Sequence, residues 1–188
     1  SLEGNFRIRG LPDIHETVFD LQIHRLSSDS HDIASVVSQL SESPSFALPA
    51  VCDRLGNLSF EGTFHGRYHD FTTTGLLGTA LGEVSSDIHL ALQNGVNYEG
   101  HLSATEFDVG TLFQRDQLGS GSFDIRINGG GFAVNEVNST VSGTVSFLDF
   151  RNYRYRNITL GGTFADQKFA GRVTVNDPNL QLDFDSDV

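Results

Sequence analysis

Apolar and polar residues alternate along most of this chain, and a period of two is the pattern of β-strands that bury one face. In the first such run, Phe19, Leu21 and Ile23 are separated by polar residues. The alternation recurs over residues 58–68, 83–92, 123–128, 141–147, 168–175 and 180–185. Turn-forming sequences separate the runs at short intervals, for example Asn94-Gly95, Gly129-Gly130-Gly131 and Asp177-Pro178-Asn179. Strands spaced so closely favour antiparallel hairpins over crossovers through helices, so we predict a mainly β fold.

The expected architecture is a curved antiparallel sheet, either a taco-like groove or an elongated β-solenoid-like array, with one short amphipathic helix. The helix is predicted at about residues 31–41, where Ile33, Val36 and Leu40 fall at helical spacing. Ser30 suits its N-cap, and Pro44 ends the helical pattern, so about residues 41–50 are predicted to be a loop. A weaker pattern predicts a second helical turn over residues 109–114.

Composition narrows the classes of protein that this chain can belong to. With 188 residues it fits one domain, and we expect residues 1–188 to be a single β-rich segment of a larger protein, since the sequence contains no Met. The net charge of −12 disfavours nucleic acid as a partner, because phosphate binding needs clustered positive charge. The lone Cys52 excludes a fold stapled by internal disulfides.

A five-residue pattern of apolar, any, Gly, any, apolar recurs along the chain. Its glycines and the apolar residues beside them share one strand face by alternation. Such a glycine is kept where a strand bends or where another group approaches the backbone closely. Two interpretations remain open: the glycines let phenylalanine rings lie over them in an ordinary core, or they widen an apolar channel. The copies run from Phe60 to Phe64, Tyr98 to Leu102, Val141 to Val145, Leu160 to Phe164 and Phe169 to Val173, with glycines Gly62, Gly100, Gly143, Gly162 and Gly171.

No residue pattern in the chain points to catalysis, so we expect a non-enzymatic protein with no metal and no cofactor. His65 and His69 have a spacing that suits a metal on a helix, but in a strand residues four apart are ~13 Å distant. The basic and aromatic stretch of residues 151–156 could stack nucleic-acid bases. In so acidic a chain, pairing of its arginines with carboxylates on neighbouring strands is the favoured interpretation.

The order of these features resembles the central region of bacterial AsmA-like proteins, closest to the TamB group and in the style of Bacteroidetes members. The resemblance spans nearly the whole chain and rests on structural motifs. They are Gly4-Asn-Phe-Arg-Ile-Arg-Gly10-Leu-Pro-Asp-Ile14, Thr17-Val-Phe-Asp-Leu21, Asp32-Ile-Ala-Ser-Val-Val37, Leu55-Gly-Asn-Leu-Ser-Phe-Glu-Gly62-Thr-Phe-His-Gly66, Gly78-Thr-Ala-Leu-Gly82, Tyr98-Glu-Gly-His-Leu-Ser-Ala-Thr-Glu-Phe-Asp-Val-Gly110, Phe150 to Tyr155, Asn157-Ile-Thr-Leu-Gly-Gly-Thr163 and Asp177-Pro-Asn-Leu180.

The resemblance implies a periplasmic segment of a protein anchored in the inner membrane, shaped as a bent β-sheet with an apolar inner surface. Members of this family are thought to carry phospholipid between the inner and outer membranes. TamB has also been tied to outer-membrane protein assembly with a barrel partner of the Omp85 type, which would dock through regions outside this sequence. On this basis phospholipid acyl chains are the expected partner of an apolar groove.

The residues predicted to line the groove are the apolar members of the glycine pattern. They are Phe60, Phe64, Tyr98, Leu102, Val141, Val145, Leu160, Phe164, Phe169 and Val173. Two other functions stay open: a chaperone-like scaffold for outer-membrane proteins, and an adhesin-like surface β protein whose apolar face is sealed as a core.

Overall fold

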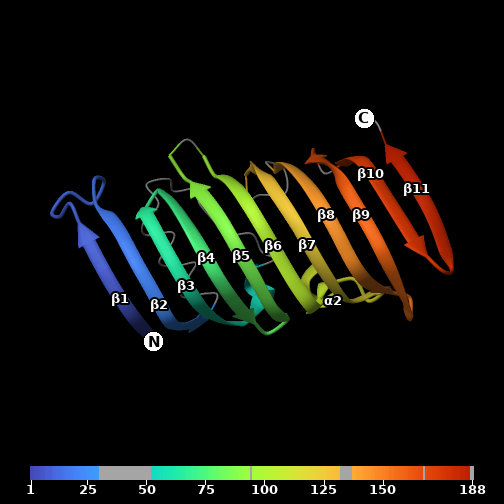
Figure 1. Ribbon diagram of the computed structural model, residues 1–188, viewed down its shortest axis with the longest axis horizontal. Coiled ribbons are helices and arrows are strands. Elements are labelled where there is room, and N and C mark those ends of the chain that lie inside the picture. The colour runs from blue at the N-terminus through green and yellow to red at the C-terminus, as the bar shows by residue number, and fades with distance from the viewer. Residues whose placement is uncertain (30–51, 94, 132–136, 167, 187–188) are drawn as a thin grey trace.

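A single antiparallel sheet forms the body of the molecule in the computed structural model, which describes residues 1–29, 52–93, 95–131, 137–166 and 168–186. Its eleven strands lie side by side in chain order, from β1 at one edge to β11 at the other (Figure 1). The strands are β1 (Leu2–Arg9), β2 (Val18–Asp29), β3 (Asn57–Arg67), β4 (Asp70–Thr79), β5 (Gly82–Ala91), β6 (Asn97–Asp108), β7 (Leu118–Gly130), β8 (Asn138–Phe150), β9 (Tyr153–Ala165), β10 (Lys168–Asp177) and β11 (Leu180–Ser186). The sheet curves but does not close into a barrel, because the two end strands, β1 and β11, do not pair with each other.

The predicted mainly β fold with antiparallel hairpins is confirmed. Each of the seven alternating runs lies largely within a strand, and the two-residue turn between β10 and β11 falls at Pro178 and Asn179. One predicted turn is wrong in place, since β7 continues through Gly129 and Gly130. Strand pairing with β8 satisfies the backbone of these glycines, which local turn preference did not foresee. The predicted helix at 31–41 and the loop at 41–50 lie outside the described residues.

Two short helical elements in the described residues lie outside the sheet: the 3₁₀-helix η1 (Cys52–Leu55) and the helix α2 (Val109–Phe113). The second confirms the weaker helical prediction. Asp108 caps α2 by accepting a hydrogen bond from the backbone N–H of Thr111 at 2.9 Å. That bond lowers the pKa of Asp108, since it favours the charged carboxylate. Neither element approaches the length of a membrane-spanning helix, and no described helix could cross a bilayer.

The two faces of the sheet differ in chemistry. Cross-strand partners share a face, so the strand register identifies which residues lie together. One transverse row through Phe64 runs Phe6, Leu21, Phe64, Thr73, Ile88, Gly100, Ile127, Val141, Gly162, Gly171 and Ser186. The alternate row on the other side runs Asn5, Gln22, Thr63, Thr74, Asp87, His101, Arg126, Ser142, Gly161, Arg172 and Asp185. We call these sides the apolar face and the polar face.

A cluster of buried apolar side chains lies at one margin of the apolar face. Phe107 is only 3% exposed and forms a cluster with Leu81 and Ala104. Side chains from η1 and α2 cover this cluster, and the Arg54 guanidinium donates a hydrogen bond of 2.5 Å to the carbonyl of Leu112 in α2. The largest cluster of buried side chains in the described residues therefore sits where the helical elements fold against the ends of β5 to β7. Single buried residues of the apolar face, Ile23, Leu58, Ile158 and Val175, lie on other strands.

Candidate functional site

All ten residues predicted to line a groove lie on the apolar face. Phe64 and Val141 belong to the row given above, and the other eight follow from the same register at even spacing along their strands. Each of the ten side chains is half-buried, neither sealed in a core nor fully in solvent. Of the elements that the structure describes, only η1 and α2 pack over this face, and they do so at one margin. The site is therefore an extended apolar surface.

The dimensions of this surface suit extended hydrocarbon. Eleven strands at ~4.8 Å spacing extend about 48 Å across the sheet. Along the strands, four successive rows of the apolar face cover about 20 Å, since residues two apart are ~6.7 Å apart. One leaflet of a bilayer has a hydrocarbon thickness of about 15 Å, half of the whole core. An acyl chain lying across the strands would thus contact roughly four of them.

The five glycines of the repeat also lie on the apolar face, and some are required by the backbone. Gly143 and Gly171 have φ angles of +151° and +150°, a region that side chains other than glycine rarely adopt. A Cβ on Gly143 would lie 2.7 Å from the Cα of Ile125 on β7. These glycines let the neighbouring backbone approach closely, which is one of the two reasons for strand glycine that the sequence suggested.

Phenylalanine rings cover two of the other glycines. The ring of Phe60 would lie 2.9 Å from a Cβ on Gly62, and that of Phe169 would lie 2.7 Å from a Cβ on Gly162. This arrangement matches the first interpretation of the repeat, in which rings lie over glycine. It does not produce an ordinary core, since Phe60 and Phe169 remain half-buried. The glycines therefore flatten the apolar face at these points and keep the rings close to the backbone.

The apolar face also contains a polar pair that the sequence did not indicate. Tyr98 on β6 and Ser139 on β8 share a hydrogen bond across the intervening β7, beside Gly129. Tyr98 is thus the one predicted lining residue with a hydroxyl. The signal that could have found the pair is the lack of a side chain at Gly129, which is the cross-strand partner of both residues.

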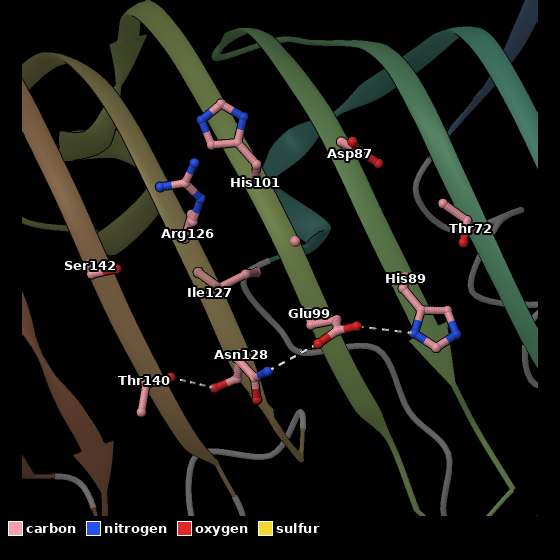
Figure 2. A pocket seen from close by; sticks show the side chains of 11 residues that line it. Thr72, Asp87, His89, Glu99, His101, Arg126, Ile127, Asn128, Thr140 and Ser142 are labelled. Atoms are coloured by element: carbon pink, nitrogen blue, oxygen red, sulfur yellow. Dashed lines mark hydrogen bonds and ion pairs between the residues drawn. The ribbon is translucent and has the colours of Figure 1, made fainter.

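The polar face has a shallow depression of about 480 Å³ over β4 to β8 (Figure 2). Its polar groups satisfy one another: the amide of Asn128 donates to Glu99 at 3.2 Å, and a ring nitrogen of His89 lies 3.8 Å from Glu99. Thr140 donates to the backbone carbonyl of Asn128 at 3.1 Å. Within the described ranges no three His, Cys, Asp or Glu residues are grouped to hold a metal ion. His65 lies 4.0 Å from Asp20 on this face.

One of the three arginines of residues 151–156, Arg154, pairs with carboxylates as the sequence favoured. The Arg154 guanidinium contacts Asp149 at 2.8 Å and Glu106 at 3.0 Å. Its hydrogen bond to Asp149 lowers the pKa of that carboxyl. The Tyr153 hydroxyl donates to Asp177 at 2.7 Å, and this bond raises the pKa of the tyrosine. The stretch forms a structural network and presents no row of stacked aromatic rings.

No protein-family model, curated protein or solved structure matches this chain. The structure defines the class as an open, eleven-stranded antiparallel sheet with one apolar and one polar face.

Proposed function

We propose that this chain is a non-enzymatic segment of an AsmA/TamB-like envelope protein, and that its apolar face carries phospholipid acyl chains between the inner and outer membranes. The observation that carries the proposal is the placement of all ten predicted lining residues on one half-buried face of an open sheet. The sequence resemblance described above supplies the periplasmic setting, the membrane-anchored parent protein and the phospholipid.

Apolar burial supplies the binding free energy. Each acyl CH₂ group removed from water contributes about 0.8 kcal/mol, so contact with a short stretch of the face outweighs the loss of lipid freedom. Such binding needs no directional polar contacts. A lipid tail can therefore shift from one strand to the next, because each row offers similar aliphatic and aromatic groups.

The polar face supports the same function by keeping the sheet in water. Side chains such as Asp87, Arg126 and Asp185 point away from the apolar face by register. A sheet with one apolar and one polar face needs an apolar partner for the first of them. Acyl chains fit this requirement better than a compact protein core, because the face is long and repetitive.

The experiment is photocrosslinking with a matched control on the opposite face. The photoreactive analogue p-benzoylphenylalanine is placed at Phe64 or Phe164 and, in separate samples, at the adjacent polar-face residues Thr63 or Thr163. The protein is purified from an envelope extract, irradiated, and analysed by native mass spectrometry and lipid extraction. We expect phospholipid adducts at Phe64 and Phe164 and few at Thr63 and Thr163.

Substitution then tests whether the contact is specific to the face. A double variant with Phe64→Asp and Phe164→Asp should lose the co-purified phospholipid. A double variant with Thr63→Asp and Thr163→Asp should still co-purify with it. Circular dichroism and a melting curve must show that each variant is folded. Equal labelling from both faces, or unchanged lipid in a folded Phe64→Asp, Phe164→Asp variant, would refute the proposal. A folded wild-type sample without lipid would instead favour an apolar face sealed as in an adhesin-like protein.

A second function, a scaffold for unfolded outer-membrane proteins, is favoured by one observation. Both edge strands expose large apolar side chains, including Phe6 at 47% and Phe184 at 50%. A client strand could pair with such an edge through its backbone. Hydrogen exchange separates the two functions: a client would protect the amides of β1 or β11, whereas lipid would protect the apolar face without adding backbone hydrogen bonds at the edges.

A further inference from the structure

The polar depression shown in Figure 2 lies in the middle of the sheet. It extends over β4 to β8, so the strands at the two ends of the chain do not contribute to it. A second depression of about 650 Å³ adjoins it on the same face, beside the turns that follow β5 and β7. The two depressions share His89, Glu99, Asn128 and Thr140. Together they form one shallow polar concavity, lined mainly by amide, hydroxyl, imidazole and carboxylate groups.

Interactions between neighbouring strands hold the floor of the polar concavity in place. One ring nitrogen of His89 lies 2.8 Å from Asp70 on β4, and the other lies 3.8 Å from Glu99 on β6. Asn128 on β7 donates a hydrogen bond of 3.2 Å to the second carboxylate oxygen of Glu99. Because these side chains already restrain one another, a ligand would not have to order them, which lowers the free-energy cost of binding.

Arg126 is a cation of the concavity that this network does not use (Figure 2). Its cross-strand partners are His101 on β6 and Ser142 on β8. The ring of His101 pairs with Asp124 at 2.8 Å, and no carboxylate in the described residues forms an ion pair with Arg126. The Ser142 hydroxyl likewise has no hydrogen bond within the described part of the chain. A guanidinium and a hydroxyl therefore lie on neighbouring strands, and an arginine fork binds a carboxylate through two parallel hydrogen bonds.

The polar face is open beside these two donors. Ser142 faces Gly161 on β9, and nothing lies within 4 Å of a Cβ added to Gly161. In the other direction along β8, the exposed Asn138 lies about 13 Å from Ser142, since the two are four residues apart. The concavity thus has a cationic end at Arg126 and an uncharged amide end at Asn138, with room between them for a ligand that has several polar groups.

The chemistry of the lining selects a class of ligand. Amide, hydroxyl and imidazole groups both donate and accept hydrogen bonds, as the hydroxyls of a sugar do. The carboxylates of Asp87 and Glu99 repel a polyanion such as a nucleic acid, whereas the guanidinium of Arg126 attracts one negative group. We propose that the polar concavity binds an oligosaccharide containing an acidic sugar, whose carboxylate pairs with Arg126 and Ser142 and whose hydroxyls bind the amides toward Asn138. The site lies on the face opposite the residues that are proposed to hold acyl chains, so it goes beyond the lipid-carrying function and does not depend on it.

Side-chain NMR signals test the binding at the residues that carry it. The chain is labelled with nitrogen-15 and titrated with the trimers of galacturonic acid, mannuronic acid and guluronic acid, and with the neutral trimer of galactose. We expect at least one acidic trimer to shift the Nε–H signal of Arg126 and the side-chain amide signals of Asn128 and Asn138, and to bind more tightly than the neutral trimer. No shift of these signals with any acidic trimer, or equal binding of the neutral trimer, would overturn the proposal.

Two matched pairs of variants test the contact with the carboxylate. Arg126→Gln should raise the dissociation constant of the acidic trimer about tenfold or more, since a charge-assisted hydrogen-bonded pair is lost. Arg7→Gln, at an exposed arginine on the polar face of β1, is its control and should leave the constant unchanged. Gly161→Glu, which places a carboxylate beside Ser142, should weaken binding more than Gly161→Gln does.

Circular dichroism checks the fold of each variant, and phospholipid bound to each is measured in parallel, so the two faces are scored separately. A folded Arg126→Gln variant with unchanged affinity, or an equal loss of affinity in Arg7→Gln, would refute the site.

Discussion

Gly62 on β3 and Gly75 on β4 face each other as cross-strand partners, and no side chain separates their backbones. A Cβ placed on Gly62 would lie 2.6 Å from the Cα of Gly75, closer than real Cβ atoms come. The ring of Phe60 lies over both residues. The pair shows how the apolar face is built: bare backbone in the middle of a strand pair, with aromatic rings lying flat over it.

Adding one methyl group to this face should destabilise the protein at a glycine whose φ angle and close neighbouring strand leave no room for a Cβ. Gly143→Ala would introduce a Cβ against β7 at a φ of +151°, and we expect a loss of about 1–3 kcal/mol or more in the free energy of unfolding. Gly161→Ala is the matched control, since nothing lies within 4 Å of its added Cβ. Urea denaturation of both variants measures the difference. Equal stability of the two variants would show that the structure does not require glycine at position 143.

The two phenylalanines near α2 should differ strongly in their contribution to stability. Phe107 is 3% exposed within the cluster at the margin of the apolar face, whereas Phe113 at the end of α2 is 57% exposed. Phe107→Ala should cost about 3–5 kcal/mol, the usual range for a buried phenylalanine. Phe113→Ala should change the free energy of unfolding by less than about 1 kcal/mol. Thermal melts on both variants test the contrast. Equal melting temperatures would show that the buried cluster around Phe107 does not stabilise the fold.

The hydrogen bond between Tyr153 and Asp177 should be worth more than a surface contact, because Asp177 is 1% exposed. Tyr153→Phe keeps the ring and removes the hydroxyl donor. We expect it to lower the free energy of unfolding measurably, because hydrogen bonds to a charged group contribute more than bonds between neutral groups. Tyr155→Phe is the control. A Tyr153→Phe variant as stable as the control would show that the backbone donors alone hold Asp177.

Asp177 should also make the free energy of unfolding depend on pH. Hydrogen bonds from the backbone of Asn179, the hydroxyl of Tyr153 and the backbone of Arg156 hold its pKa below the ordinary value. A carboxyl with a lowered folded-state pKa contributes stability above its unfolded pKa of about 3.9, and this contribution is lost as the pH falls through the folded-state pKa.

The measurement is the free energy of unfolding between neutral pH and the acid limit of the folded state. Asp177→Asn should be less stable than the wild type at neutral pH, and the gap should narrow below about pH 4 as the wild-type carboxylate takes up a proton. Asp116→Asn is the control for loss of one charge. A gap that stays constant with pH would show that the charge of Asp177 is not what these donors stabilise.

The sequence alone determined the strands that contain the seven alternating runs, and the two faces of each. Alternation assigned Phe60 and Phe64 to one face and Thr63 to the other, because side chains of a strand alternate regardless of what pairs with it. It predicted no run over β1 or β4. In β4, threonine and glycine occupy positions such as Thr73 and Gly75 on the apolar face, so the contrast between faces is small.

Only the tertiary structure decided how strongly each residue is buried and which glycines lie within strands. Phe107 and Phe113 look alike in sequence, yet α2 folds back over the first and leaves the second exposed. Gly129 and Gly130 look like a turn, but pairing with β8 keeps them in a strand. These outcomes depend on contacts between residues distant along the chain, and a local pattern carries no information about which distant segment will lie beside it.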